Sequence, residues 1–478
     1  MTGGSATGGM SSLKRLRASR FGRIGLSVGL KLIGAAIAFI WQLFTLRILG
    51  PSAGGLVAVV QSQMRLIGTT GALGRDRSLS LTLPLAESQA AIEQRVRQAQ
   101  RSGSIATSVI LVAVFVSWTV TGNYGWQSLS TLILTIIGAL TFCLLVGAAG
   151  AARGLHAPLA ADLGFTILPL SLSSVMFALI GAWYGWTLFL ALICLVSGQA
   201  VALLYFRIVM QRSLQNWTSV GADNHAVDER SSKARRLDQL AIAVCTTFSA
   251  MYPDALLIIV GYASSSASAA AFGIAVRYIR LARFVPVSFL HVREPALARM
   301  WNEGETKRLG NEIHTIATSS FFVSVGILLP LMLFASTFLG IFGHSFAAFE
   351  SVLRFVVLAE LINSLALMPT SMLLIGGLFR GLATINLCVY LSGLIISAFA
   401  IVAFGGEGAA VVLVGTNLLL AGVTSSYCFR RMGIRADAIS SCAILIRNKI
   451  RLGSSGHSSV RHSEELRIPH SKEDNSNV

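Results

Sequence analysis

Several ionisable residues fall inside long apolar stretches of the chain, where a charge needs a partner or water. The basic ones are Lys31, Arg65, Arg277, Arg280 and Arg283, and the acidic ones are Asp254 and Glu360. A charged side chain at membrane depth costs roughly 2.5–3.5 kcal/mol on insertion scales. We therefore expect these groups to face a water-filled cavity or one another rather than lipid.

Three of the arginines recur at every third position, from 277 to 283. On a helix this spacing spreads them over about one third of the circumference, so they can line one wall of a cavity. A guanidinium binds phosphate through two parallel hydrogen bonds, so such a wall suits an anionic ligand. For Arg283, Arg280 and the deeper Arg277 the alternative is that the side chains extend to the membrane surface. The same alternative is open for Lys31, whereas Arg65 lies near the middle of its stretch and favours the cavity.

The two acids have two possible roles. Asp254 and Glu360 either form structural ion pairs or take up a proton or cation during a transport cycle. Asn363, one helical turn after Glu360, is expected on the same wall. Arg47 and Arg354 lie at the ends of their stretches and are expected to anchor the protein at the membrane interface.

The composition is that of a membrane protein. Of the 478 residues 54% are hydrophobic and 12% are charged, whereas soluble domains carry about 25% charged residues. The net charge is +17, but the basic residues form short clusters between apolar runs and do not gather on one nucleic-acid-binding face. We therefore expect contact with the bilayer and none with nucleic acid.

The lengths of the apolar runs predict an all-α protein with about twelve transmembrane helices, because about 20 residues span the hydrocarbon core. The first six spans are predicted at 24–46, 54–74, 103–121, 128–150, 159–182 and 185–206. The second six are predicted at 239–261, 268–291, 314–337, 352–376, 382–404 and 409–429. The stretch 85–101 is predicted to lie as a separate helix along the membrane surface.

The distribution of basic residues predicts the orientation. The intervals on one side of the predicted spans hold 31 of the 38 Lys and Arg residues, which places both chain ends in the cytoplasm. The expected parts are a basic N-terminus (1–23), a six-helix lobe (24–206), a linker (207–238), a second six-helix lobe (239–429) and a basic, disordered tail (430–478).

No motif for a cofactor or a metal is found. The six cysteines are scattered and are expected to act as small apolar side chains. The chain has no Walker sequence for ATP and no zinc-binding histidine pattern. We expect neither a cofactor nor enzymatic activity.

Four segments resemble polysaccharide flippases of the MOP (multidrug/oligosaccharidyl-lipid/polysaccharide) superfamily. They are LRILGPSAGGLVAVVQSQ from 46, PDALLIIVGYASSSASAAAFGIAVR from 253, IFGHSFAAFESVLRFVVLAELINSL from 341 and FGGEGAAVVLVGTNL from 404. Their order along the chain and their places relative to the predicted spans agree with that family, over residues 20–430.

The resemblance implies two lobes around a central cavity that opens alternately to each side of a bacterial cytoplasmic (inner) membrane. Its implied cargo is an oligosaccharide linked to undecaprenyl diphosphate, for exopolysaccharide, capsule or O-antigen synthesis, with a polymerase and a chain-length regulator as further partners. The alternatives are a cation-coupled exporter of small amphipathic compounds and a membrane polymerase or ligase. An arginine-rich wall repels cationic drugs, and the expected outer turns are too short for a catalytic loop, so both alternatives are disfavoured.

Overall fold

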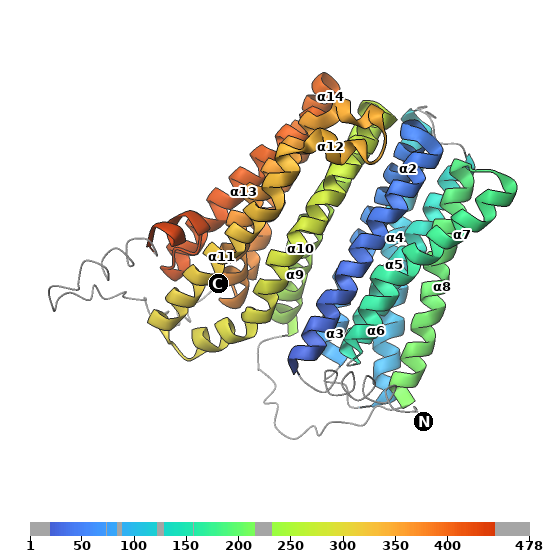
Figure 1. Cartoon of the computed structure of the whole chain (residues 1–478). Helices are drawn as coiled ribbons and strands as arrows, with labels where there is room; N and C mark the ends of the chain where they lie inside the picture. Colours follow the sequence, from blue (N-terminus) through green and yellow to red (C-terminus); the bar gives the residue numbers. More distant parts are fainter. Residues whose placement is uncertain are drawn as a thin grey trace, which may run out of the picture.

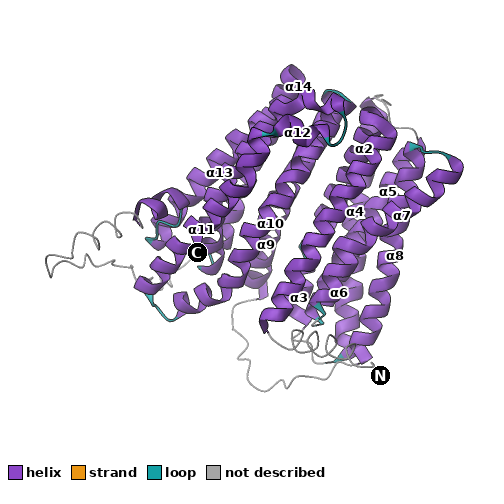
Figure 2. Cartoon of the chain, in the orientation of Figure 1, coloured by secondary structure: helices purple, strands orange, loops and turns teal. Residues whose placement is uncertain are grey.

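The computed structural model describes residues 20–72, 74–83, 88–121, 129–155, 157–215 and 232–444. All the regular elements in these ranges are helices (Figure 2). They form two bundles that lie side by side (Figure 1). The basic N-terminus before residue 20, the centre of the predicted linker and the tail after residue 444 lie outside the described residues.

The first bundle, or first lobe, contains the helices before residue 216. They are α2 (Arg20–Ala72), α3 (Arg75–Thr82), α4 (Gln89–Thr121), α5 (Leu129–Gly154), α6 (Pro158–Asp162), the π-helical turn η2 (Leu163–Ile167), α7 (Leu168–Tyr184) and α8 (Leu188–Gln215). Its core contains Trp41, Val60, Met64, Phe177 and Leu192.

The second lobe contains the helices after residue 231. They are α9 (Ser232–Ala263), α10 (Ser266–Asn302), α11 (Thr306–Leu333), α12 (Ala335–Gly340), the 3-10 turn η3 (His344–Phe349), α13 (Glu350–Ile375) and α14 (Phe379–Met432). Its core also takes in Leu46, Ala58 and Val59 of α2, so apolar packing continues across the boundary between the lobes.

Two of the elements are pairs of antiparallel helices joined at a glycine. Gly50 in α2 and Gly405 in α14 have φ values of 76° and 58°, a region that glycine enters without a Cβ clash. The chain folds back at both glycines, as close contacts across each turn indicate. A Cβ on Gly54 would lie 2.7 Å from the Leu46 side chain, and one on Gly408 would lie 2.2 Å from the Ala400 carbonyl oxygen.

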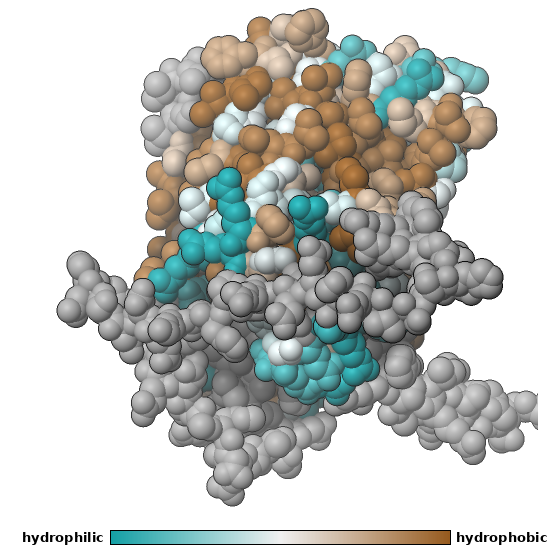
Figure 3. All heavy atoms as spheres, turned by 90° about the vertical axis from the view of Figure 1, so that its left-hand side faces the viewer, coloured by the Kyte–Doolittle hydropathy of each residue, from teal (hydrophilic) through white to brown (hydrophobic). Residues whose placement is uncertain are grey.

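Helices occupy all twelve predicted spans. Eight helical stretches among the described residues are long and apolar enough to cross a membrane, and two of these, α2 and α14, are the folded pairs. The remaining spans are α4 and α10, of which α10 carries the three arginines in its apolar part. A space-filling view shows a broad zone of hydrophobic residues on the face turned to the viewer (Figure 3).

Three sequence predictions need correction. Residues 89–101 do not form a separate surface helix, because α4 runs without interruption from Gln89 to Thr121. The predicted tail is ordered up to residue 444, since Ser441 is buried and its hydroxyl lies 2.9 Å from Nδ1 of His314. Cys388 is exposed rather than packed in the core.

The molecule has two ends, the base and the cap. The base contains the first residues of α2 and α9 and the last residues of α8 and α10; the cap contains the glycine turns at 50 and 405 and the α9–α10 turn (Figure 1). At the cap the lobes touch closely: the Oγ atoms of Ser52 and Ser266 lie 3.1 Å apart, and Arg47 Nε donates to the Ile341 carbonyl oxygen at 2.9 Å.

Candidate functional site

Helix α10 directs its three arginines toward three different neighbours. Arg277 Nη2 donates to Gln61 Oε1 of α2 at 2.6 Å, Arg280 Nη2 to Asp254 Oδ2 of α9 at 2.8 Å, and Arg283 Nε lies 3.5 Å from Glu360 Oε1 of α13. Three residues further along the helix, the side chain leaves the axis in a direction rotated by about 60° and about 4.5 Å further on. The row therefore passes from the boundary between the lobes into the second lobe.

Asp254 is the centre of a polar cluster at this boundary. Ser62 Oγ donates to its Oδ1 at 3.0 Å. Its Oδ2 accepts from Arg280 and also lies 3.7 Å from Arg65 Nη2. The Asp254 side chain is only 2% exposed, so these donors replace the water that a carboxylate otherwise binds.

A proline helps to shape α9 at this point. Pro253 has no N–H to donate to the carbonyl of Ser249, one turn earlier, so the helix is locally weakened directly before Asp254. Ser249 in turn lines a cavity in the second lobe.

The cluster carries more positive than negative charge. Arg65, Arg280 and Arg277 act electrostatically on one another and on the single carboxylate of Asp254. Three guanidinium groups against one carboxylate leave a net charge of about +2 at the lobe boundary. Such a site favours an anion, because an uncompensated buried charge is costly.

Glu360 forms a second cluster that belongs to one lobe. Its carboxylate lies beside Arg283 and accepts hydrogen bonds from Asn363 Nδ2 at 3.2 and 3.3 Å. Arg280, Arg283 and Asn363 line a cavity of about 400 Å³ between α9, α10, α13 and α14. Asn363 thus lies on the wall where the sequence places it.

The structure does not bring Lys31 to the arginines. Lys31 Nζ lies 3.9 Å from Asp162 Oδ2, and Arg153 Nη2 lies 3.6 Å from Asp162 Oδ1, all within the first lobe. Asp162 is a third buried acid that the sequence analysis missed, with a side chain 3% exposed. Its position inside the predicted span 159–182 was the available signal. The π-helical turn directly after it ends before Pro169, whose missing N–H disturbs regular α-helical bonding.

The two expected interface anchors differ. Arg354 lies 3.2 Å from Glu350 on the surface of α13, as an exposed pair one turn apart. Arg47 instead bonds the Ile341 carbonyl oxygen of the other lobe and so contributes to the closed cap.

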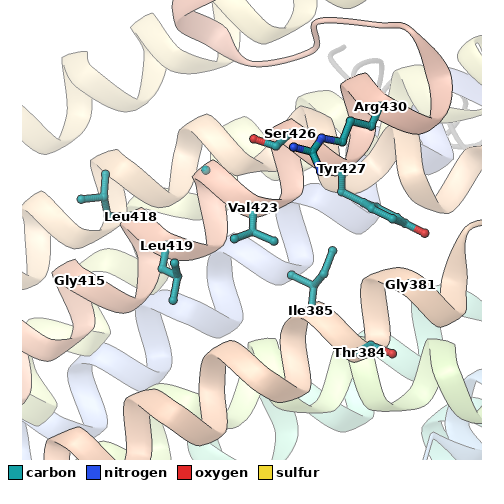
Figure 4. Close-up of a pocket in the computed structure, with 11 residues that line it drawn as sticks. Gly381, Thr384, Ile385, Gly415, Leu418, Leu419, Val423, Ser426, Tyr427 and Arg430 are labelled. Carbon is teal, nitrogen blue, oxygen red and sulfur yellow. The ribbon is translucent and has the colours of Figure 1, made fainter.

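A second, larger cavity lies elsewhere. It measures about 980 Å³ and runs between the two halves of α14, where Ile385, Leu418, Leu419 and Val423 line it and Arg430 lies at one end (Figure 4). Leu418 and Leu419 are 59% and 50% exposed. This groove is therefore part of the apolar outer surface and shares no lining residue with the arginine cluster.

No group of three His, Cys, Asp or Glu side chains in the described ranges is arranged to hold a metal ion.

Comparisons with known proteins identify the fold. No family model and no curated protein matches the chain. Among solved structures, a MATE protein in complex with MaL6 is 15% identical over 88% of this chain and 98% of its own, with a TM-score of 0.59. An outward-facing multidrug resistance MATE family transporter of the MOP superfamily is 15% identical over 88% and 97% of the chains, with a TM-score of 0.59. An inward-facing one is 15% identical over 85% and 93%, with a TM-score of 0.55.

These likenesses confirm the predicted fold class, an all-helical membrane protein with two lobes as in MATE transporters. The two solved neighbours described as outward-facing and inward-facing have the same fold as this chain.

Proposed function

We propose that this protein moves an oligosaccharide linked to a polyprenyl diphosphate across the bacterial cytoplasmic membrane by alternating access. The polymer served is a surface polysaccharide, such as exopolysaccharide, capsule or O-antigen. In this proposal the base of the molecule and both chain ends face the cytoplasm, as the basic residues predict. A polymerase and a chain-length regulator are the proposed protein partners.

The observation that carries the proposal is the surplus of guanidinium groups between the lobes. Arg65, Arg277 and Arg280 have one carboxylate, Asp254, among them. A diphosphate brings several strong acceptor oxygens and negative charge to such a place. The polyprenyl chain stays in lipid, while the charged head group and sugars pass through the wet interior.

A second candidate function is export of small amphipathic compounds. The solved neighbours described as multidrug resistance transporters favour it. The arginine surplus opposes it for cationic drugs, because like charges brought close together repel one another.

The test replaces Arg277 in a bacterial strain that lacks the gene. We expect Arg277→Ala to reduce surface polysaccharide about tenfold or more, since a hydrogen bond to a charged group contributes roughly 1.5–3 kcal/mol. Arg277→Lys keeps the charge but loses the planar fork, and is expected to restore part of the polymer. Arg354→Ala, on the exposed pair with Glu350, is the matched control and is expected to act as the parent.

Protein level in the membrane is measured alongside for each variant. Full polymer with Arg277→Ala at normal level would remove Arg277 from the cargo site. If the parent protein itself restores no polysaccharide but lowers the accumulation of a fluorescent drug, the exporter function replaces the flippase.

A further inference from the structure

The carboxylate of Asp254 occupies the position that an anionic ligand would take. One oxygen faces two guanidinium groups, from Arg280 at 2.8 Å and Arg65 at 3.7 Å, and the other accepts a hydroxyl hydrogen bond from Ser62 at 3.0 Å. Two guanidinium groups and a hydroxyl are a donor set that binds phosphate oxygens equally well. Protein carboxylate and ligand phosphate would compete for it.

The donor set is divided between the two lobes. Ser62 and Arg65 come from α2 in the first lobe, whereas Arg280 and Asp254 itself come from α10 and α9 in the second. Asp254, whose side chain is only 2% exposed, thus contacts both lobes. The neighbouring hydrogen bond from Arg277 to Gln61 also crosses the boundary.

The two arginines hold Asp254 unequally. Arg280 belongs to the same lobe and makes the short contact, whereas Arg65 belongs to the other lobe and is almost 1 Å more distant, at 3.7 against 2.8 Å. Of the two guanidinium groups, Arg65 is therefore the one from which an incoming anion would displace Asp254 more readily. The pair between Asp254 and Arg280 then stays within the second lobe.

We propose that Asp254 is an internal substitute for the phosphate of the cargo: in the empty transporter it occupies Arg65 and Ser62 and ties the lobes together, and the cargo phosphate takes its place on these two residues. This inference rests on the proposed function for the identity of the cargo. It assigns Asp254 as a positioning residue that sets both the affinity for the anion and the closure of the empty protein.

The experiment uses full-length protein in nanodiscs of phosphatidylethanolamine and phosphatidylglycerol, with two readouts. The first is the affinity for farnesyl diphosphate, with farnesol as the probe without phosphate. The second is disulfide formation in the double variant Ser52→Cys and Ser266→Cys, since the native Oγ atoms of these two residues lie 3.1 Å apart at the closed cap. The background carries Cys388→Ser and Cys442→Ser, since these are the cysteines of the described residues that are not buried.

For Asp254→Asn we expect farnesyl diphosphate to bind about tenfold more tightly, because a competing carboxylate is lost; coupling between competing ligands is typically of this order. Without ligand, we expect the 52–266 disulfide to form more slowly, because the tie between the lobes is weakened. Ser62→Ala removes one donor from the first lobe and keeps the pair with Arg280. We expect Ser62→Ala to slow formation of the 52–266 disulfide less than Asp254→Asn does. If Asp254→Asn folds poorly, Ser62→Ala alone still tests the tie between the lobes.

Glu360→Gln is the matched control. It also removes a buried carboxylate from an arginine, but its partners Arg283 and Asn363 belong to the same lobe. The rate of the 52–266 disulfide should therefore not change.

Two results would overturn the assignment of Asp254. One is an affinity for farnesyl diphosphate that is equal or lower in Asp254→Asn than in the parent, while the parent does bind this ligand. The flippase function would then stand, but the cargo phosphate would not take the place of the Asp254 carboxylate. The other is a disulfide rate equal to that of the parent in both Asp254→Asn and Ser62→Ala. If neither parent nor Asp254→Asn binds farnesyl diphosphate more tightly than farnesol, the proposed cargo is wrong, while a slowed disulfide would still support the tie between the lobes.

Discussion

The clusters around Asp254 and Glu360 use the same chemistry in two different places. Each has a buried carboxylate, an arginine from α10 and one neutral donor, Ser62 or Asn363. The Asp254 cluster draws its donors from both lobes, whereas the Glu360 cluster lies within the second lobe. In the proposed alternating-access cycle, only the Asp254 cluster would therefore respond directly to a separation of the lobes.

This difference separates two uses of a charge inside a membrane protein. An ion pair within one lobe is preserved through a rigid-body movement and so contributes equally to both end states. A pair across the boundary exists in one state only, so its free energy shifts the balance between the states. The same distinction applies to apolar contacts and to close backbone approaches.

The largest expected effect comes from removing Arg280, the arginine that makes the shortest contact with Asp254. Arg280→Ala leaves Asp254 with Arg65 as its nearest cation, at 3.7 Å. Removing one partner of a buried pair costs about 3–5 kcal/mol, so we expect a clear fall in the thermal unfolding temperature in detergent and loss of polysaccharide transport.

Arg354→Ala serves as the reference, because exposed ion pairs contribute only about 0–1 kcal/mol. If both variants unfold at the same temperature, the pair of Arg280 with Asp254 does not carry the stability that its burial implies. Restoration of stability by Arg280→Ala combined with Asp254→Asn would show that the lone carboxylate is the cause.

The sequence was sufficient for the parts of the molecule that depend on local composition. Apolar length gave the twelve helices, since a span depends on one stretch of chain alone. The spacing of three residues predicted that Arg277, Arg280 and Arg283 line one wall of a cavity. Arg280 and Arg283 line the cavity of about 400 Å³, whereas Arg277 is not among its lining residues and bonds Gln61 at the lobe boundary.

The partners of these residues could not be predicted from the sequence. Arg65 and Asp254 are far apart in the chain, and nothing local indicates that Ser62 and Gln61 complete the cluster. For Lys31 the sequence left both the cavity and the membrane surface open, and the packing of α2 against the π-helical turn η2 places it beside Asp162 instead. Three-dimensional neighbours of this kind follow from how helices pack, which a single stretch of residues does not encode.

A second prediction concerns the closest approach of the lobes at the cap. A Cβ on Gly55 would lie 2.0 Å from the carbonyl oxygen of Ser266, which is backbone and cannot rotate away. We expect Gly55→Ala to push the lobes apart at the cap and to slow the disulfide between cysteines at 52 and 266 severalfold.

The matched control is Gly415→Ala on α14, where a Cβ meets nothing within 4 Å. That substitution is expected to leave the disulfide rate unchanged and to stabilise the helix by up to about 1 kcal/mol. An unchanged disulfide rate in Gly55→Ala would mean that the lobes are not in close contact at this position in the membrane.

The smallest effect is expected at Gln42, a buried amide of α2 in the cap half of the lobe boundary. Gln42 is 3% exposed, and neither its Nε2 nor its Oε1 has a hydrogen-bond partner among the described residues. Its Nε2 lies against Gly273 of α10. An unsatisfied buried polar group costs about 1–3 kcal/mol, and opening of the cap would let water reach the amide and remove that cost.

Gln42 therefore favours opening, and Gln42→Leu is expected to hold the cap closed. The disulfide between cysteines at 52 and 266 should form faster than in the parent, while polysaccharide transport falls because the lobes separate less often. Thr45→Val, one turn away and bonded only within α2, provides the comparison and should leave the disulfide rate unchanged. Slower formation of the 52–266 disulfide in Gln42→Leu would show that the amide stabilises the closed cap. The difference between contacts across the lobe boundary and contacts within one lobe would then hold for the ion pairs alone.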